Sequence, residues 1–213
     1  MHKVIFVDFD GTITKTDTCN AMVEAFAKGA WKEIARLWEE KKLTTVECAN
    51  RLFELFDAEL DDVGRLMDTI EIDEYFKEFL SLCRSSGYKV YILSDGYDYN
   101  IRRILGRYDI ELPFYSNTLL YDGGFKIQAP HHNIDCGNCG TCKSNLMARL
   151  RENGDEAVYI GDGYSDTCAA VKADIIFAKG SLYKFCTENK VPSIHFESFK
   201  DIIESGRVFM ERI

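Results

Sequence analysis

The segment that most constrains the fold is Val4-Ile5-Phe6-Val7-Asp8-Phe9-Asp10-Gly11-Thr12, an apolar run that ends in two aspartates, a glycine and a threonine. An unbroken run of Val, Ile and Phe is typical of a strand buried on both faces of a sheet. Gly11 permits a tight turn after this strand. We therefore expect Asp8 and Asp10 in the crevice at the strand's carboxyl end, where open parallel sheets bind ligands.

Asp8 and Asp10 together favour phosphoryl chemistry. Two buried carboxylates at close range repel each other unless a cation lies between them. Mg²⁺ takes oxygen ligands, usually one or two carboxylates with waters and phosphate oxygens, so this pattern predicts a Mg²⁺ site. Taken alone, the pair also fits an ordinary surface loop, because Asp is common after strands.

A second apolar strand, residues 89–93, ends in Ser94-Asp95-Gly96. We interpret these three residues as a phosphate-binding segment. The Ser94 hydroxyl can donate to a phosphate oxygen, and backbone N–H groups near Gly96 can do the same at the start of the following helix.

A third strand, residues 157–160, ends in Gly161-Asp162-Gly163 with Asp166 soon after. We expect Asp162 to complete the Mg²⁺ site together with Asp8 and the backbone carbonyl of Asp10. Asp166 is expected to orient a metal-bound water or Lys143.

Further strands at 174–178 and 193–196 alternate with helical segments near 182–186 and 199–203. Alternating strands and helices predict a doubly wound, Rossmann-like α/β fold with a parallel sheet. A chain of 213 residues is long enough for one such core and a smaller accessory unit.

Residues 17–72 contain helical patterns and no strand pattern, which is too much chain for a plain connection between a strand and its return helix. We predict a helical cap domain over 17–72, inserted into a core domain made of 1–16 and 73–213. Such a lid excludes water and adds substrate contacts. The alternative is that these helices simply flank the sheet.

Residues 114–129 predict a β-hairpin that turns at 121–124, interpreted as a small second lid element. The following loop contains Cys136, Cys139 and Cys142, which with His131 or His132 make a candidate Zn²⁺ site. A disulfide between two of these cysteines, or reduced thiols, are the alternatives. Lys143 comes next and reaches the crevice if the loop crosses it; otherwise it is a solvated surface lysine.

The net charge of −9, without a basic stretch, argues against nucleic acids and anionic membranes as partners. No apolar run approaches the length of a membrane span, and the chain passes from Met-His-Lys into the first strand without a signal-peptide pattern. We therefore expect a cytoplasmic protein whose eight cysteines are mostly thiols or metal ligands. A monomer and a homodimer are equally compatible with the sequence.

The set Asp8-x-Asp10-Gly11-Thr12, Ser94, Lys143 and Gly161-Asp162-x-x-x-Asp166 resembles the four motifs of the haloacid dehalogenase superfamily of phosphohydrolases. Their order and spacing match over most of the chain. The helical insertion after the first motif and the Cys-rich loop before Lys143 are similar to the phosphoserine-phosphatase-like branch, and residues 177–182 also resemble phosphatases of methionine salvage. Asp95 stands where many relatives have glycine.

The resemblance implies that Asp8 attacks a phosphomonoester and forms an aspartyl-phosphate, which water then hydrolyses. It implies that Asp10 protonates the leaving alcohol and later deprotonates the water, and that Ser94 and Lys143 bind the phosphoryl group. Asp17 at the neck of the cap and Arg51 on a cap helix are candidate substrate contacts, or ordinary solvated charges.

Several functions stay open at this stage. The predicted substrate is a small phosphorylated metabolite: a thio-sugar ketone of methionine salvage, phosphoserine, phosphocholine or phosphoethanolamine, or pyridoxal phosphate. A phosphotransferase on the same scaffold would return the phosphoryl group to a bound substrate. A phospho-accepting regulatory domain would also carry strand-end acids and a lysine, although Asp10 is poorly placed beside a phosphoaspartate meant to last, because it can activate water.

Overall fold

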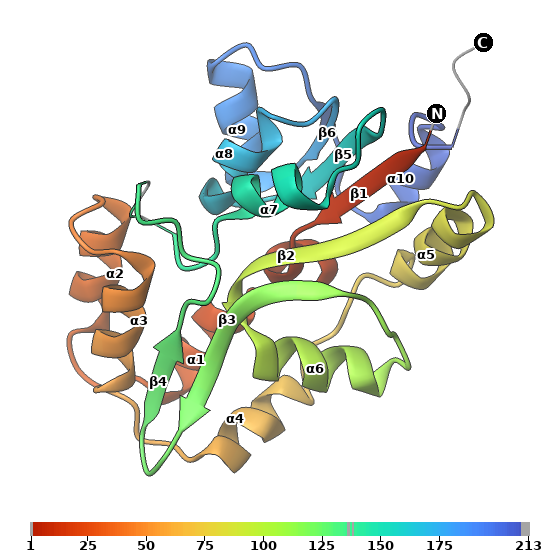
Figure 1. The fold of residues 1–213 in the computed structure, drawn as a ribbon. Helices are drawn as coiled ribbons and strands as arrows, with labels where there is room; N and C mark the ends of the chain where they lie inside the picture. Colours follow the sequence, from red (N-terminus) through yellow and green to blue (C-terminus); the bar gives the residue numbers. More distant parts are fainter. Residues whose placement is uncertain (1, 136, 138, 210–213) are drawn as a thin grey trace.

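The computed structural model describes residues 2–135, 137 and 139–209, which form a seven-stranded sheet with helices on both faces (Figure 1). The strand order is β4-β3-β2-β1-β5-β6-β7. The strands are β1 (Lys3–Val7), β2 (Lys89–Tyr97), β3 (Phe114–Tyr121), β4 (Phe125–Gln128), β5 (Glu156–Gly161), β6 (Ile175–Ala178) and β7 (Ile194–His195). Among these described strands β4 runs antiparallel to β3 and the other neighbouring pairs run parallel, which confirms the predicted α/β class.

Helices connect and cover these strands. They are α1 (Thr18–Phe26), α2 (Trp31–Glu39), α3 (Thr45–Phe53), α4 (Leu60–Met67), α5 (Phe76–Ser85), α6 (Asp98–Arg107), α7 (Lys143–Leu150), α8 (Thr167–Ala170), α9 (Gly180–Glu188) and α10 (Phe199–Glu204). In the described part of the chain, none of them has the length and apolar character that a membrane crossing requires.

The apolar run of β1 is explained by burial on both sides. Successive side chains of a strand point to opposite faces. Ile5 and Val7 belong to a hydrophobic cluster that includes side chains of α5, α6 and α10. Val4 and Phe6 belong to a second cluster that includes side chains of α7, α8 and α9. The sheet is therefore doubly wound, and a strand with polar residues on one face could not occupy its centre.

Helices α1–α4 lie between β1 and α5 in the chain. The chain leaves and re-enters the sheet region at one place, because Thr14 forms an antiparallel bridge with Ile72 and the Asp73 N–H donates to the Ile13 carbonyl at 2.8 Å. Figure 1 shows α2 and α3 beside β4, at the end of the sheet where β1 ends. We therefore keep 17–72 as a proposed cap on a core of 1–16 and 73–213.

Two local predictions differ from the structure. The hairpin is present, but its first strand, β3, joins the main sheet parallel to β2 rather than forming a separate lid. Strand β2 does not end at Leu93; it continues through Ser94, Asp95 and Gly96, and Tyr97 pairs with Asn117 after a register shift. The shift lets the backbone bend at these residues while the strand keeps its neighbour.

Candidate active site

Lys143 lies at the centre of the site. It is the first residue of α7 and its side chain is 2% exposed. Its Nζ donates to Asp8 Oδ1 at 2.6 Å and to Asp166 Oδ1 at 2.5 Å, and lies 3.4 Å from Ser165 Oγ. The alternative of a solvated surface lysine is therefore wrong.

Asp8 follows β1 directly and is held there because its backbone N–H donates to the Ile160 carbonyl of β5 at 2.9 Å. Burial raises the pKa of Asp8 well above its ordinary value, and the negative charge of Asp166 adds to this shift. The Lys143 charge acts in the opposite direction. Burial alone lowers the pKa of Lys143, but Asp166 and Asp8 outweigh it, and the net shift is strongly upward. The lysine is therefore an ammonium ion in the folded protein.

Asp8, Asp162 and Asp166 form a cluster in which one carboxylate oxygen from each lies within 4.8 Å of the others. Asp162 is held by the Thr12 hydroxyl, which donates to its Oδ1 at 2.8 Å. Burial, then the charge of Asp166, raises the pKa of Asp162. Three carboxylates around one ammonium leave excess negative charge, and an all-oxygen donor set is the kind that Mg²⁺ prefers. The residues therefore fit this ion.

Gly11 closes this cluster from the β1 side. Its φ is +75°, in the left-handed region, and a Cβ there would lie 2.6 Å from Asp162 Oδ2. Any other residue would strain the turn and displace the Asp162 carboxylate.

The Asp10 side chain does not belong to the cluster of Asp8, Asp162 and Asp166. Its Oδ1 accepts hydrogen bonds from the Thr18 hydroxyl and from the Thr18 N–H at 3.1 Å, and its Oδ2 accepts from Ser94 Oγ at 3.1 Å. Burial, then the charge of Asp17, raises the pKa of Asp10 to about 6. A carboxyl group with this pKa exchanges its proton near neutral pH, as a general acid and base requires.

The Ser94-Asp95-Gly96 segment, interpreted from the sequence as phosphate-binding, forms hydrogen bonds with other parts of the protein. Ser94 is fully buried and bonds Asp10, while the Gly96 N–H donates to Ser94 Oγ at 2.9 Å. The Asp95 carboxylate accepts hydrogen bonds from Thr45, Asn117 and Thr141. These bonds fix the segment within β2, and whether its groups also contact phosphate stays a prediction.

The two candidate substrate contacts differ in position. Asp17 caps α1 by accepting from the Asn20 N–H at 2.8 Å, and burial, opposed by this bond, raises its pKa. The negative charge of Asp162 also raises the pKa of Asp17, and its carboxylate lies close to that of Asp10. Asp17 therefore borders the site. Arg51 is exposed on α3 and does not line the cavity beside the site.

The candidate Zn²⁺ site finds no support in the described residues. His132 Nδ1 lies 2.8 Å from the Cys139 carbonyl oxygen, and the Cys142 thiol is buried 3.6 Å from Ser144 Oγ. The clusters of potential metal ligands in the described part of the chain do not include these side chains. Cys136 lies outside the described residues.

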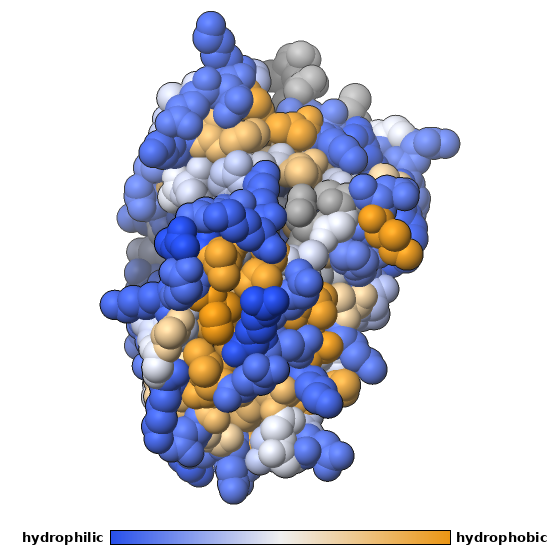
Figure 2. Space-filling model, turned by 90° about the vertical axis from the view of Figure 1, so that its left-hand side faces the viewer, coloured by the Kyte–Doolittle hydropathy of each residue, from blue (hydrophilic) through white to orange (hydrophobic). Residues whose placement is uncertain are grey.

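A cavity of about 300 Å³ lies between the proposed cap and the core, and one of its lining residues, Ser165, has its hydroxyl 3.4 Å from Lys143 Nζ. The cap contributes Trp38, Leu43 and Thr45 to its walls, and the core contributes Asp95, Tyr164 and Cys168. Tyr164 is 57% exposed and Trp38 is 39% exposed, which is unusual for large aromatic side chains. The face of the molecule that carries α2 and α3 shows hydrophobic groups gathered among hydrophilic ones (Figure 2). A cavity of this size with apolar and aromatic walls is of the kind that binds small organic molecules.

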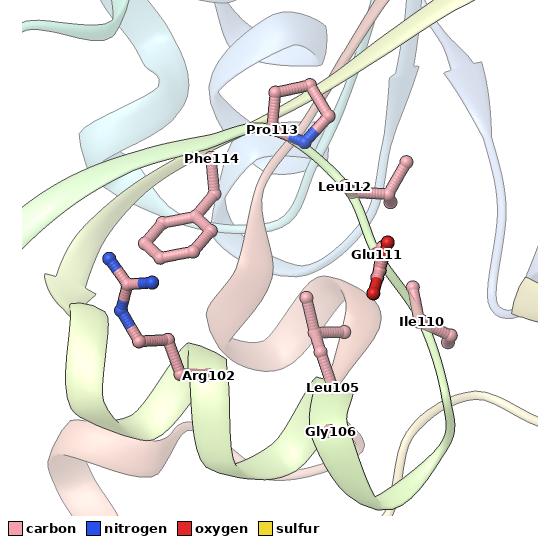
Figure 3. A pocket seen from close by; sticks show the side chains of 8 residues that line it. All are labelled: Arg102, Leu105, Gly106, Ile110, Glu111, Leu112, Pro113 and Phe114. Atoms are coloured by element: carbon pink, nitrogen blue, oxygen red, sulfur yellow. The ribbon is translucent and has the colours of Figure 1, made fainter.

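A second cavity, of about 420 Å³, lies between the end of α6 and the start of β3 (Figure 3). Arg102 lies over the Phe114 ring at its rim, 4.9 Å from the ring centroid. Its lining residues do not include Ser165, the neighbour of Lys143 that lines the first cavity, so size alone does not identify the active site.

The sequence did not reveal several residues that support the site. Tyr159 donates its hydroxyl to Asp166 Oδ1 at 2.6 Å, and Thr18 holds Asp10. Tyr159 lies in the apolar run of β5. A buried phenol needs a hydrogen-bond partner, so its presence in this run indicated that a polar group lies nearby. The Thr18 hydroxyl offered no signal, because Ser and Thr are ordinary at the start of helices.

Comparisons with known proteins agree with this geometry. The family model described as "Putative Phosphatase" matches residues 3–185. A 2-hydroxy-3-keto-5-methylthiopentenyl-1-phosphate phosphatase of Bacillus cereus is 32% identical over 216 residues, covering 99% of each chain. The enzyme of the same name from Bacillus mycoides is 31% identical over the same coverage.

Solved structures share the fold. A phosphoserine phosphatase with an analogue of its phospho-aspartyl intermediate has a TM-score of 0.70 and 20% identity, covering 96% of this chain and 98% of that one. A haloacid dehalogenase family hydrolase of Salmonella enterica serovar Typhi has a TM-score of 0.72 and 21% identity, covering 94% and 69%. The predicted haloacid dehalogenase-like fold, with its helical insertion, is therefore confirmed.

Proposed function

This chain belongs to the Putative Phosphatase family, and from that premise we propose that it is a Mg²⁺-dependent phosphomonoesterase that hydrolyses a small phosphorylated metabolite through an aspartyl-phosphate. The observation that carries the proposal is the buried group of Lys143, Asp8 and Asp166, with Asp162 beside it. A carboxylate in such a group is both a nucleophile and a ligand for a cation.

Asp8 is the proposed nucleophile. It lies at the end of a rigid central strand and keeps a carboxylate oxygen within 2.6 Å of an ammonium group. Lys143 stays charged, so it can stabilise the negative charge that accumulates on the transferring phosphoryl group. Asp166 also accepts a hydrogen bond from Lys143, and Tyr159 holds Asp166 in place by donating to the same carboxylate oxygen.

Asp10 is the proposed general acid and base. Thr18 and Ser94 fix its carboxyl group, and a pKa of about 6 allows it to hold a proton for the leaving alkoxide. After the alcohol departs, the same carboxylate can take a proton from the attacking water. A bound Mg²⁺, held by Asp8, Asp162 and the Asp10 carbonyl with Asp166 nearby, would offset negative charge on the phosphoryl oxygens.

The proposed substrate is the 2-hydroxy-3-keto-5-methylthiopentenyl-1-phosphate named for the Bacillus relatives. The cavity beside Lys143 supports this choice, because Trp38, Leu43 and Tyr164 give it apolar and aromatic walls. A thioether makes favourable contacts with aromatic rings. Phosphoserine, phosphocholine or phosphoethanolamine, and pyridoxal phosphate are the alternatives for the assay.

The test is Mg²⁺-dependent phosphate release from a panel of these compounds by wild type and by Asp8→Asn. We expect rapid release from one compound by the wild type. Loss of the nucleophile should reduce the rate by on the order of 10⁴-fold or more, while thermal unfolding shows that the variant is folded.

The outcomes separate the competing functions. An Asp8→Asn variant with the wild-type rate would overturn the nucleophile assignment. A wild type that releases no phosphate but retains a long-lived phosphoryl group would instead favour a phospho-accepting regulatory domain. Transfer of the phosphoryl group to a second metabolite would favour a phosphotransferase.

A further inference from the structure

We propose that Asp95 is a positioning residue that links closure of the cap to the placement of Lys143, with Thr45 as its partner on the cap. This inference rests on the proposed function and adds to it two residues, Asp95 and Thr45, to which the proposed mechanism assigns no chemical step. Three separate parts of the chain meet at the Asp95 carboxylate: the cap, strand β3 and the loop before α7.

The hydrogen bond from Thr141 to Asp95, which we call the core arm of the link, holds the start of α7. Thr141 donates its backbone N–H to Asp95 Oδ1 at 2.7 Å and lies two residues before Lys143. Asn117 of β3 donates to the Asp95 carbonyl at 2.7 Å and to Oδ1 at 3.2 Å. Thr141 is 1% exposed, so loss of Asp95 leaves a buried N–H without its acceptor. The position of Lys143 therefore depends on Asp95.

The cap arm of the link is one side-chain hydrogen bond. Thr45 donates its hydroxyl to Asp95 Oδ2 at 3.0 Å. Thr44, not Thr45, caps α3 together with Glu47, so the Thr45 hydroxyl is not needed to start the helix. A hydrogen bond from a hydroxyl to a carboxylate in a partly buried place is stronger than one between neutral groups. The cap is thus tied to the core next to the candidate leaving-group cavity.

The link extends to that cavity. Trp38 Nε1 donates to Thr45 Oγ1 at 3.3 Å, and Trp38, Thr45 and Asp95 all line the cavity. A leaving group that fills the cavity and packs on Trp38 favours the arrangement in which Thr45 reaches Asp95. The same arrangement holds Thr141 and hence Lys143 in place for the phosphoryl group. Binding of a leaving group in the cavity is therefore coupled, through Asp95, to the placement of Lys143 for the phosphoryl group.

The experiment measures the two arms separately. Thr45→Val removes the cap arm with almost no change of volume, Thr45→Ser keeps the hydroxyl, and Asp95→Ala removes both arms. Thr69→Val is the matched control, because Thr69 is an exposed cap residue whose hydroxyl bonds the nearby Leu66 carbonyl. Thermal unfolding of each variant shows whether it is folded.

The first readout does not depend on activity. Trp31 and Trp38 are the two tryptophans of the chain, so Trp31→Phe leaves Trp38 as the sole reporter. In this background we expect Thr45→Val and Asp95→Ala to make Trp38 more accessible to quenching by acrylamide, because the part of the cap that carries Trp38 and Thr45 is no longer bonded to Asp95. Thr45→Ser and Thr69→Val should leave the quenching as it is in the parent.

The second readout compares two substrates: acetyl phosphate, whose leaving group is too small to fill the cavity, and the panel compound that the wild type hydrolyses best. The lost hydrogen bond to a carboxylate predicts a decrease in kcat/KM of about 10-fold or more for Thr45→Val on the panel compound, and a smaller decrease on acetyl phosphate. Asp95→Ala should lower kcat on both, since it also releases Thr141.

The inference is overturned if Thr45→Val matches its parent in Trp38 quenching, if Thr45→Ser is as impaired as Thr45→Val, or if Thr45→Val loses as much on acetyl phosphate as on the panel compound. A wild type without phosphatase activity would refute the proposed function instead. The quenching experiment then still decides whether Thr45 and Asp95 hold the cap.

Discussion

Replacement of Lys143 by methionine tests the electrostatic core of the site. Methionine has a similar length and no charge, so it fills the same space but leaves Asp8 and Asp166 without their ammonium partner. Removing one member of a buried ion pair typically costs about 3–5 kcal/mol, because the remaining charge is uncompensated. We use the lower end, about 3 kcal/mol, since Asp8 can take up a proton. For a chain of this size that corresponds to a decrease in Tm of roughly 6–12 °C.

The loss should depend on pH. Burial raises the pKa of Asp8, and Lys143 is the group that opposes this. Without the lysine the folded state prefers a protonated Asp8 more strongly. A carboxyl group with a raised pKa stabilises the fold at low pH, and this contribution is lost as the pH rises through the folded-state pKa. Lys143→Met should therefore be most destabilised near neutral pH and approach wild type in acid.

The assay is urea unfolding of the variant and of the wild type in the presence of EDTA at about pH 7.5 and about pH 5. Groups such as Asp10 titrate in both proteins, so the change with pH in the stability difference between variant and wild type reports the protonation that Lys143 opposes. Lys28→Met is the control: Lys28 pairs with Asp57 on the surface, and exposed pairs contribute little. Phosphate release should fall about 10²- to 10³-fold, since the charge that stabilises the phosphoryl group is gone. A Lys143→Met protein as stable as Lys28→Met at both pH values, with near wild-type turnover, would refute the reasoning.

Three further predictions follow from the same geometry. Asp10→Asn should lower turnover of an alcohol phosphate by about 10²- to 10⁴-fold. In the wild type, kcat/KM should decrease as the pH rises above about 6, where Asp10 loses its proton, and this decrease should be absent in the variant. An unchanged pH–rate profile would reject Asp10 as the acid. Mg²⁺ at about 100-fold above its Kd should stabilise the wild type by about 2.7 kcal/mol relative to EDTA, which is roughly 5–10 °C in Tm. The stabilisation should be absent in Asp162→Asn. Differential scanning fluorimetry measures the Tm of the two proteins with and without Mg²⁺. Trp38→Ala should raise KM about tenfold or more for a substrate with an apolar leaving group, and much less for acetyl phosphate; an equal rise on both would remove the cavity from the account.

The sequence predicted well the edge of the sheet that carries Asp8 and Asp162, because the residue patterns that mark it are short and unambiguous. The buried run before Asp8 has a single plausible structure, and parallel strands bring their carboxyl ends to one edge. The position of Lys143 was open from the pattern alone. Its selection came from the family resemblance, and the structure places its Nζ between Asp8 and Asp166.

The prediction failed where tertiary pairing overrides local signals. Gly96 suggested that β2 ends early, but pairing of Tyr97 with Asn117 extends the strand. The grouping of Asp95 with phosphate ligands, made because of its place beside Ser94, stays a prediction, but the sequence offered no sign of the bonds that Asp95 makes within the protein. Its three hydrogen-bond donors come from residues 45, 117 and 141, and no local pattern connects segments so distant in the chain.

The central claim is that the phosphoryl group is transferred twice, first to Asp8 and then to water. Its most direct test is the stereochemical course at phosphorus, measured with a substrate whose phosphate is made chiral by oxygen isotopes. Two in-line displacements, each with inversion, predict net retention of configuration. Net inversion would mean that water attacks the substrate directly, and it would contradict the role assigned to Asp8.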